Sequence, residues 1–105
     1  MRKPLNEKVA IITGAGQGIG KGLALALAKR GVKIVCIGRR LGPIEETAQE
    51  IKDLGGQALA ISCNTADRDM VNEVVKQTVD TFGTVDVMIN NAQSIPQSAP
   101  VEETT

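Results

Sequence analysis

An alternation of apolar runs with amphipathic segments does most to limit what this chain can fold into. Four short runs are nearly continuous in Val, Ile, Leu and Ala, which is typical of parallel strands covered on both faces. We expect strands over Val9–Thr13, Lys33–Gly38, Ala58–Cys63 and Val85–Asn90. Because strands that alternate with helices form right-handed crossovers, this pattern predicts a parallel sheet.

Each intervening segment has apolar residues at helical spacing and a glycine close to its end. The first helix is expected from Gly18 to Arg30. The second has Pro43 in a first-turn position, and the third follows an N-cap at Asp67 and ends at Phe82. The sequence therefore predicts an α/β fold in the order strand, helix, strand, helix, strand, helix, strand.

Four strands and three helices make about half of a Rossmann-type, doubly wound sheet, and we expect the N-terminal half. Residues 91–105 are polar and rich in proline, and are expected to form a loop and the start of a helix that is not completed. Residues 1–105 are thus interpreted as a partial, truncated Rossmann domain. In the expected strand order 3-2-1-4, Val85, Val87 and Ile89 would lie on an uncovered edge, so we expect marginal stability or pairing through that edge.

The segment TGAGQGIG, residues 13–20, lies between the first strand and the first helix. Glycines let the backbone approach a diphosphate, and the helix N-terminus adds partial positive charge. The general dinucleotide pattern G-x-G-x-x-G fails, because Ile19 stands where its third glycine is required. The Walker A pattern also fails, since Ala15 replaces its first glycine and Gly22 replaces its magnesium-binding hydroxyl residue.

The spacing T-G-x-x-x-G-x-G is met by Thr13, Gly14, Gly18 and Gly20. Together with the Asn-Asn-Ala sequence at 90–92, after the fourth strand, it resembles the short-chain dehydrogenase/reductase family. The resemblance covers essentially the whole chain. The alternative is that the glycines form only a structural turn and the asparagines only cap a strand.

The resemblance implies a cofactor site but supplies no catalytic residue within this chain. Gly14, Gly18, Ile19 and Gly20 would face the diphosphate, and Thr13 would tie the turn to the neighbouring strand. Asn90 and Ala92 would line the adenosine ribose side, and Asn64 would contact the adenine. The full set of expected cofactor-binding residues is Thr13, Gly14, Gln17, Gly18, Ile19, Gly20, Gly38, Arg39, Arg40, Asn64, Thr65, Asn90 and Ala92.

The end of the second strand predicts NADP as the cofactor. Gly38 stands where an NAD-type member of the family would have Asp, and no carboxylate follows before Glu45. The guanidinium of Arg39 can receive a 2′-phosphate through two parallel hydrogen bonds. Two points oppose this prediction: Gln17 occupies a turn position that is often basic in NADP-type members, and Arg39 with Arg40 could be a solvated pair.

Two departures from the family pattern affect the expected site. Gln93 replaces the Gly that usually follows Asn-Asn-Ala, and Asn64 replaces a frequent Asp. The family's catalytic Ser, Tyr and Lys lie beyond the fourth strand, and this chain contains no Tyr and no His. We therefore expect an NADP-dependent carbonyl or alcohol oxidoreductase in the complete form, with this chain alone inactive. The alternative is a non-catalytic nucleotide-binding or interaction module.

Composition limits the possible partners. Twelve basic and twelve acidic residues cancel, so no global field favours nucleic acid or an anionic membrane. No apolar run approaches the ~20 residues of a membrane span. Cys36 and Cys63 lie among apolar residues and are expected to be reduced and buried, with no metal site, in a cytoplasmic protein. The resemblance also implies a small-molecule substrate and a homo-oligomer.

Overall fold

The computed structural model describes residues 4–91 and has the alternating order that the sequence predicts. The strands are β1 (Val9–Thr13), β2 (Lys33–Gly38), β3 (Ala58–Ser62) and β4 (Val87–Ile89). The helices are α1 (Gly18–Lys29), α2 (Leu41–Asp53) and α3 (Arg68–Phe82), preceded by a short 3-10 turn, η1 (Leu5–Glu7). The expected α/β fold is confirmed, whereas η1 was not expected.

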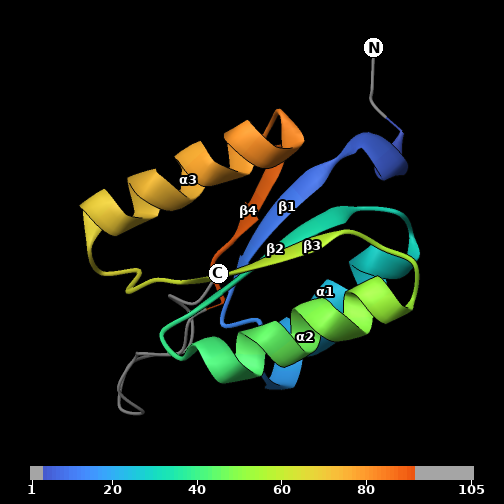
Figure 1. Ribbon diagram of the computed structural model, residues 1–105, viewed down its shortest axis with the longest axis horizontal. Coiled ribbons are helices and arrows are strands. Elements are labelled where there is room, and N and C mark those ends of the chain that lie inside the picture. Colours follow the sequence, from blue (N-terminus) through green and yellow to red (C-terminus); the bar gives the residue numbers. More distant parts are fainter. Residues whose placement is uncertain (1–3, 92–105) are drawn as a thin grey trace, which may run out of the picture.

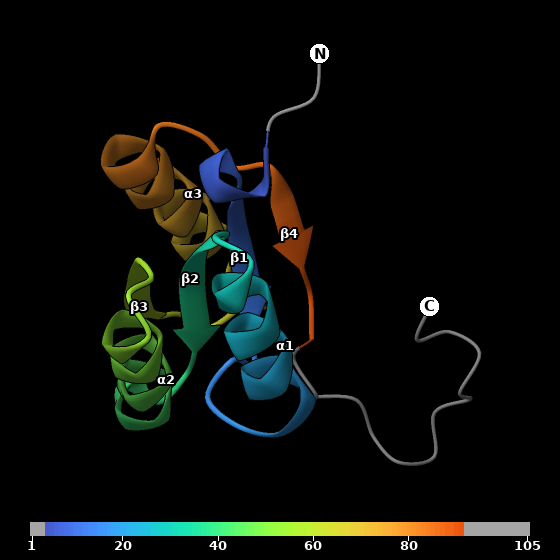
Figure 2. The same ribbon diagram turned by 90° about the vertical axis from the view of Figure 1, so that its right-hand side faces the viewer.

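The four strands form one parallel sheet in the order β3-β2-β1-β4, as expected for a doubly wound fold. Helices α1 and α2 cover one face of the sheet and α3 covers the other (Figure 1, Figure 2). In the register, Ile11 of β1 lies opposite Val35 of β2 and Met88 of β4. This places β1 inside the sheet, where all five of its residues are buried.

The nearly continuous apolar run of β1 serves two cores. Ala10 and Ile12 pack into the cluster that contains residues of α1 and α2, whereas Val9 and Ile11 pack into the cluster below α3. Successive side chains of a strand point to opposite faces, so a strand covered on both faces needs apolar residues throughout. Each fully buried Ile stabilises the fold by roughly 1.5–3 kcal/mol relative to an exposed one.

The predicted third helix is confirmed at both ends. The Asp67 carboxylate accepts hydrogen bonds from the backbone N–H groups of Asp69 and Met70, at 3.0 and 3.3 Å. These bonds satisfy donors that have no partner within the helix. At the other end Gly83 adopts a φ of 89°, a left-handed conformation that glycine adopts without strain.

The fourth strand is shorter than predicted, at Val87–Ile89 instead of Val85–Asn90. It pairs only with β1 among the strands of the described chain, and Val87 and Met88 are 40% and 47% exposed. The backbone N–H of Val9 donates to the Asp86 carboxylate at 2.9 Å. This side chain therefore connects β1 to the residue just before β4, at the end of the ladder between the two strands. Of the three residues expected to be uncovered, Val87 is exposed, whereas Val85 and Ile89 are half-buried against the two cores. The effect of this edge on stability remains a prediction.

Two further expectations concern cysteines and membranes. Cys36 and Cys63 are both buried and free, as predicted. Between residues 4 and 91 no helix combines the length and the hydropathy needed to cross a bilayer. The predicted loop and incomplete helix at 91–105 lie outside the described residues from position 92 onward.

Candidate functional site

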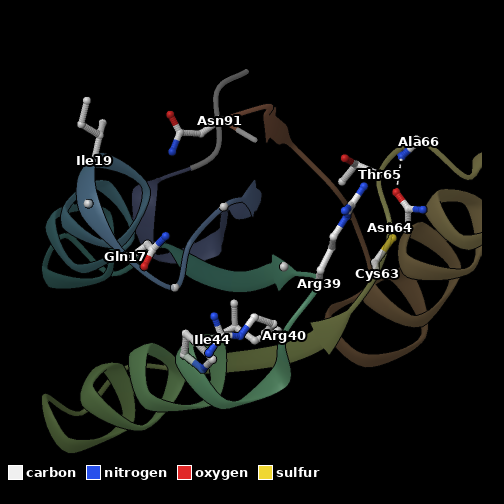
Figure 3. A pocket seen from close by; sticks show the side chains of 15 residues that line it. Gln17, Ile19, Arg39, Arg40, Ile44, Cys63, Asn64, Thr65, Ala66 and Asn91 are labelled. Carbon is white, nitrogen blue, oxygen red and sulfur yellow. Dashed lines mark hydrogen bonds between the residues drawn. The ribbon is translucent and has the colours of Figure 1, made fainter. Parts of the chain in front are cut away.

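A cleft of about 720 Å³ opens where the carboxyl ends of β1, β2 and β3 meet. Its walls come from the glycine turn before α1, the junction of β2 with α2, the loop after β3, and Asn91 after β4 (Figure 3). Parallel strands place their carboxyl ends at one edge of the sheet, which is where open α/β sheets bind ligands. The strand order thus brings together segments that are far apart in the sequence.

The glycine turn has a backbone that other residues could not readily adopt. Gly14 and Gly18 have φ angles of 65° and 60°, in the left-handed region. A Cβ at Gly18 would meet nothing within 4 Å, so the backbone here is open to the cleft. The first N–H groups of α1, which begins at Gly18, have no partners within the helix. The turn therefore offers backbone donors and the positive end of a helix dipole to an anion.

Gly20 is buried and has a different role. A Cβ at this position would lie 2.8 Å from the carbonyl carbon of Gly14 and closer still to its oxygen. It would also lie 2.7 Å from the side-chain nitrogen of Asn91. Only glycine lets the first turn of α1 pack this closely against the start of the turn.

Thr13 links the turn to the segment after β4, as predicted. Its hydroxyl accepts a hydrogen bond from the backbone N–H of Asn91 at 2.6 Å. The same hydroxyl can donate to the side-chain oxygen of Asn90 at 3.1 Å or to the Ile89 carbonyl oxygen at 3.4 Å. The two asparagines thus lie at the same edge of the sheet as the glycine turn.

Arg39 and Arg40 follow β2 directly, and both are exposed at the cleft. Arg40 is the N-cap residue of α2, and the Arg39 side chain points toward the Asn64 and Thr65 side of the cleft (Figure 3). The Ser62 hydroxyl donates to the Arg39 carbonyl oxygen at 2.9 Å, which anchors the backbone beneath this guanidinium. Among the described residues that line the cleft, these two arginines are the only charged side chains.

The loop after β3 forms the wall opposite the turn. The side-chain oxygen of Asn64 accepts a hydrogen bond from the backbone N–H of Ala66 at 3.0 Å. Asn64, which was expected to contact the adenine, therefore also holds the loop in shape. The neighbouring Cys63 is buried, and burial, with a smaller contribution from the Asp67 charge, raises the pKa of its thiol.

Lys21 follows the last glycine of the turn, where a Walker A motif has its phosphate-binding lysine. Here its ammonium group pairs with the Glu50 carboxylate of α2 at 2.7 Å. This hydrogen bond raises the pKa of Lys21. The lysine does not line the cleft, which agrees with the rejection of the Walker A pattern.

The structure brings most of the predicted site residues to the cleft: Gly14, Gln17, Gly18, Ile19, Gly38, Arg39, Arg40, Asn64 and Thr65. Thr13, Gly20 and Asn90 do not line it, and they contact or support the turn instead. Ala92 lies outside the described residues. The prediction omitted Gly16, Pro43, Ile44, Cys63, Ala66 and Asn91 as lining residues.

Some of the omitted residues had a signal in the sequence. Asn91 belongs to the Asn-Asn-Ala motif, and Gly16 belongs to the glycine turn. Pro43 and Ile44 reach the cleft because α2 begins at Leu41 and its first turn lies beside Gly16. That contact depends on how α2 packs, which no local pattern reveals.

The cleft is suited to hold an anionic ligand. It offers backbone donors at the turn and two guanidinium groups, with no carboxylate among its described lining residues. No group of three or more potential metal ligands occurs within residues 4–91. Since the chain contains no His or Tyr, the site lacks two common groups for proton transfer at a carbonyl.

Comparison with known proteins gives consistent matches to one family. The model of the family described as short chain dehydrogenase matches residues 8–105. The chain is 40% identical, over 98 residues, to the short-chain dehydrogenase/reductase homolog YusS of Bacillus subtilis, covering 92% of this chain and 89% of that protein. It is 41% identical to cyclohexanol dehydrogenase of an Acinetobacter species, covering 98% of this chain but only 41% of that enzyme.

A solved structure of NAD+-bound xylitol dehydrogenase matches with a TM-score of 0.84 at 32% identity. The match covers 96% of this chain and 39% of that one. Apart from the Bacillus homolog, the chain thus spans less than half of these relatives. The matching fold, the cleft at the strand ends and the family model agree, and the chain belongs to the short-chain dehydrogenase/reductase family of oxidoreductases.

Proposed function

We propose that the cleft binds a nicotinamide dinucleotide and prefers NADP to NAD. The observation that supports this preference is the positive charge of the cleft. Arg39 and Arg40 line it, and none of its described lining residues has a carboxylate. An acidic residue at the end of β2 would accept hydrogen bonds from the ribose hydroxyls of NAD and repel a 2′-phosphate. Gly38 at that position leaves the 2′-phosphate of NADP unopposed.

The residues present fit such a cofactor. The open backbone at Gly18 and the N-terminus of α1 would hold the diphosphate. The Arg39 guanidinium would hold the 2′-phosphate, and the loop that contains Asn64 and Thr65 would border the adenine. Asn64 can donate to the adenine from its amide nitrogen, and its oxygen, which accepts from the Ala66 N–H, retains a second lone pair.

The bound nicotinamide would supply a hydride from its C4 atom to a carbonyl carbon, and we propose a carbonyl or secondary alcohol as the substrate of the complete form. The names of cyclohexanol dehydrogenase and of a 3-oxoacyl-[acyl-carrier-protein] reductase among the relatives support this substrate class. This chain would bind and orient the cofactor, and the 105 residues include no Tyr to supply the proton. We propose that the complete enzyme is cytoplasmic and homo-oligomeric, to be tested by cell fractionation and analytical ultracentrifugation.

A second candidate is a nucleotide-binding or interaction module without chemistry. It is favoured by the Bacillus homolog, of which this chain spans 89%. The intact mass of the natural protein separates the two candidates. A mass well above 11.0 kDa supports the enzyme, whereas a mass equal to it supports the module.

Titration calorimetry with NADPH and NADH tests the proposed cofactor. We expect tighter binding of NADPH, and we expect Arg39→Ala to weaken NADPH binding about tenfold or more while NADH changes little. Hydrogen bonds to charged groups contribute roughly 1.5–3 kcal/mol, and 1.4 kcal/mol is a factor of ten. Arg30→Ala is the matched control, because Arg30 is also exposed, follows α1, and does not line the cleft. Equal affinity for the two cofactors, or a preference for NADH, would refute the proposed specificity.

A further inference from the structure

The hydroxyl of Thr47 forms a hydrogen bond outside its own helix, although a threonine in a helix can satisfy its hydroxyl within the helix. Thr47 lies in α2, is fully buried, and donates to the carbonyl oxygen of Ala15 at 2.9 Å, across 32 residues of sequence. Its local alternative, the carbonyl oxygen of Pro43 one turn earlier, lies at 3.3 Å. Thr78 in α3 shows the ordinary arrangement, with its buried hydroxyl donating to Val74 one turn earlier at 2.8 Å.

The acceptor of this bond is the centre of the glycine turn. The backbone N–H of Ala15 donates to the Ile37 carbonyl oxygen of β2 at 3.3 Å, and the Ala15 side chain is fully buried. The hydrogen bond from Thr47 therefore satisfies the other backbone polar group of Ala15, its carbonyl oxygen. On the next residue, a Cβ at Gly16 would lie 2.7 Å from the Cβ of Pro43, so the turn also packs directly on α2.

We propose that Thr47 is a positioning residue that holds the glycine turn in the conformation that receives a diphosphate. The inference rests on the proposed function, because it takes the turn as the diphosphate site. Loss of the hydroxyl would leave the Ala15 carbonyl without this partner and would loosen the turn at the residue that joins it to α2. Ligands that carry a diphosphate would bind more weakly, whereas binding at the arginines after β2 would not change.

Three variants and three ligands test the proposal. Thr47→Val removes the hydroxyl with little change in shape, Thr47→Ser retains it, and Thr78→Val removes an equally buried hydroxyl far from the turn. The ligands are NADPH, ADP, and adenosine 2′-monophosphate, which has no diphosphate. We expect Thr47→Val to bind NADPH and ADP about tenfold more weakly, with adenosine 2′-monophosphate within twofold. Thr47→Ser and Thr78→Val should stay within twofold for all three.

Amide hydrogen exchange supplies a readout that needs no ligand. The amides of residues 16–19 should exchange faster in Thr47→Val than in the wild type, and should be unchanged in Thr78→Val. Unchanged exchange at the turn, or an equal loss of affinity for all three ligands, would overturn the proposal. If Thr47→Val does not fold, Thr47→Ser tests the proposal instead. This variant keeps the hydroxyl, so a fivefold loss of its ADP affinity would show that the hydroxyl is not what supports diphosphate binding.

Failure of the proposed function gives a separate result. A wild-type chain that binds none of the three ligands would refute the nucleotide site, whatever Thr47 does. The exchange rates would then decide the Thr47 proposal alone, with faster exchange confined to Thr47→Val in its favour and equal rates against it.

Discussion

Two glycines in the same helix should respond to alanine in opposite directions. Gly20 and Gly22 both lie in α1, where replacement of glycine by alanine favours the helix by about 1 kcal/mol. At Gly22 the new Cβ meets nothing within 4 Å, so Gly22→Ala should stabilise the chain by up to about 1 kcal/mol. The surroundings of Gly20 are entirely different.

At Gly20 the new Cβ would lie 2.8 Å from the carbonyl carbon of Gly14, where ordinary contacts begin near 3.4 Å. The obstacle is backbone, so α1 and the turn must move apart, and overpacking of this kind costs about 1–3 kcal/mol or more. At the upper end of that range, the helix gain of about 1 kcal/mol offsets only part of the loss. We expect Gly20→Ala to lower the free energy of unfolding by about 2 kcal/mol.

Urea denaturation of the wild type and both variants measures these changes directly. The two variants should differ by about 3 kcal/mol, and thermal melts should separate by roughly 4–8 °C for each kcal/mol. Gly20→Ala should also weaken NADPH binding, whereas Gly22→Ala should not, because Gly22 is exposed and does not line the cleft. Equal stability of the two variants would show that the close approach at Gly20 has no energetic weight, and would refute the reasoning.

Two further predictions concern pH and specificity. Burial raises the pKa of the Cys36 thiol to about 12, from 9.0, so ionisation favours the unfolded chain. Stability from this thiol is complete below pH 9 and is lost as pH rises toward 12; at pH 10 the loss should be about 1 to 2 kcal/mol. Cys63 also has a raised pKa and remains in Cys36→Ala, so urea denaturation at pH 8 and pH 10 should show a larger loss in the wild type than in Cys36→Ala, and parallel profiles would contradict the prediction. Ser62→Ala removes the hydrogen bond to the Arg39 carbonyl and should weaken NADPH binding about threefold, with NADH unchanged. An equal change for both cofactors in calorimetric titrations would argue against this role.

The interior elements were predictable because their patterns are local. The buried run of β1 and the Asp67 cap of α3 are visible in a few consecutive residues, and both were found as expected. The exceptions arise from tertiary structure. β4 pairs only with β1 among the described strands, and its ladder is shorter than its apolar run.

The same distinction holds for the candidate site. The glycine turn and the arginines were predicted from spacing, and most of them do line the cleft. The hydrogen bond between Asn64 and Ala66 was not predicted, because the sequence does not show whether an asparagine side chain bonds to its own loop or is free. The bond from Thr47 to Ala15 joins residues 32 apart, so no local pattern could indicate it.

In the proposed site, affinity and cofactor choice are carried by different chemical groups. The turn from Gly14 to Gly18 would act through its backbone, which substitution of the two arginines leaves in place, whereas Arg39 and Arg40 would act through their side chains. Because α2 begins directly after Arg40 and is bonded to the turn through Thr47, it would fix the distance between the two proposed phosphate sites. Substitutions at residues 38–40 should therefore change the preference between NADP and NAD without loss of the diphosphate site, while changes in α2 that release the turn should weaken both cofactors together.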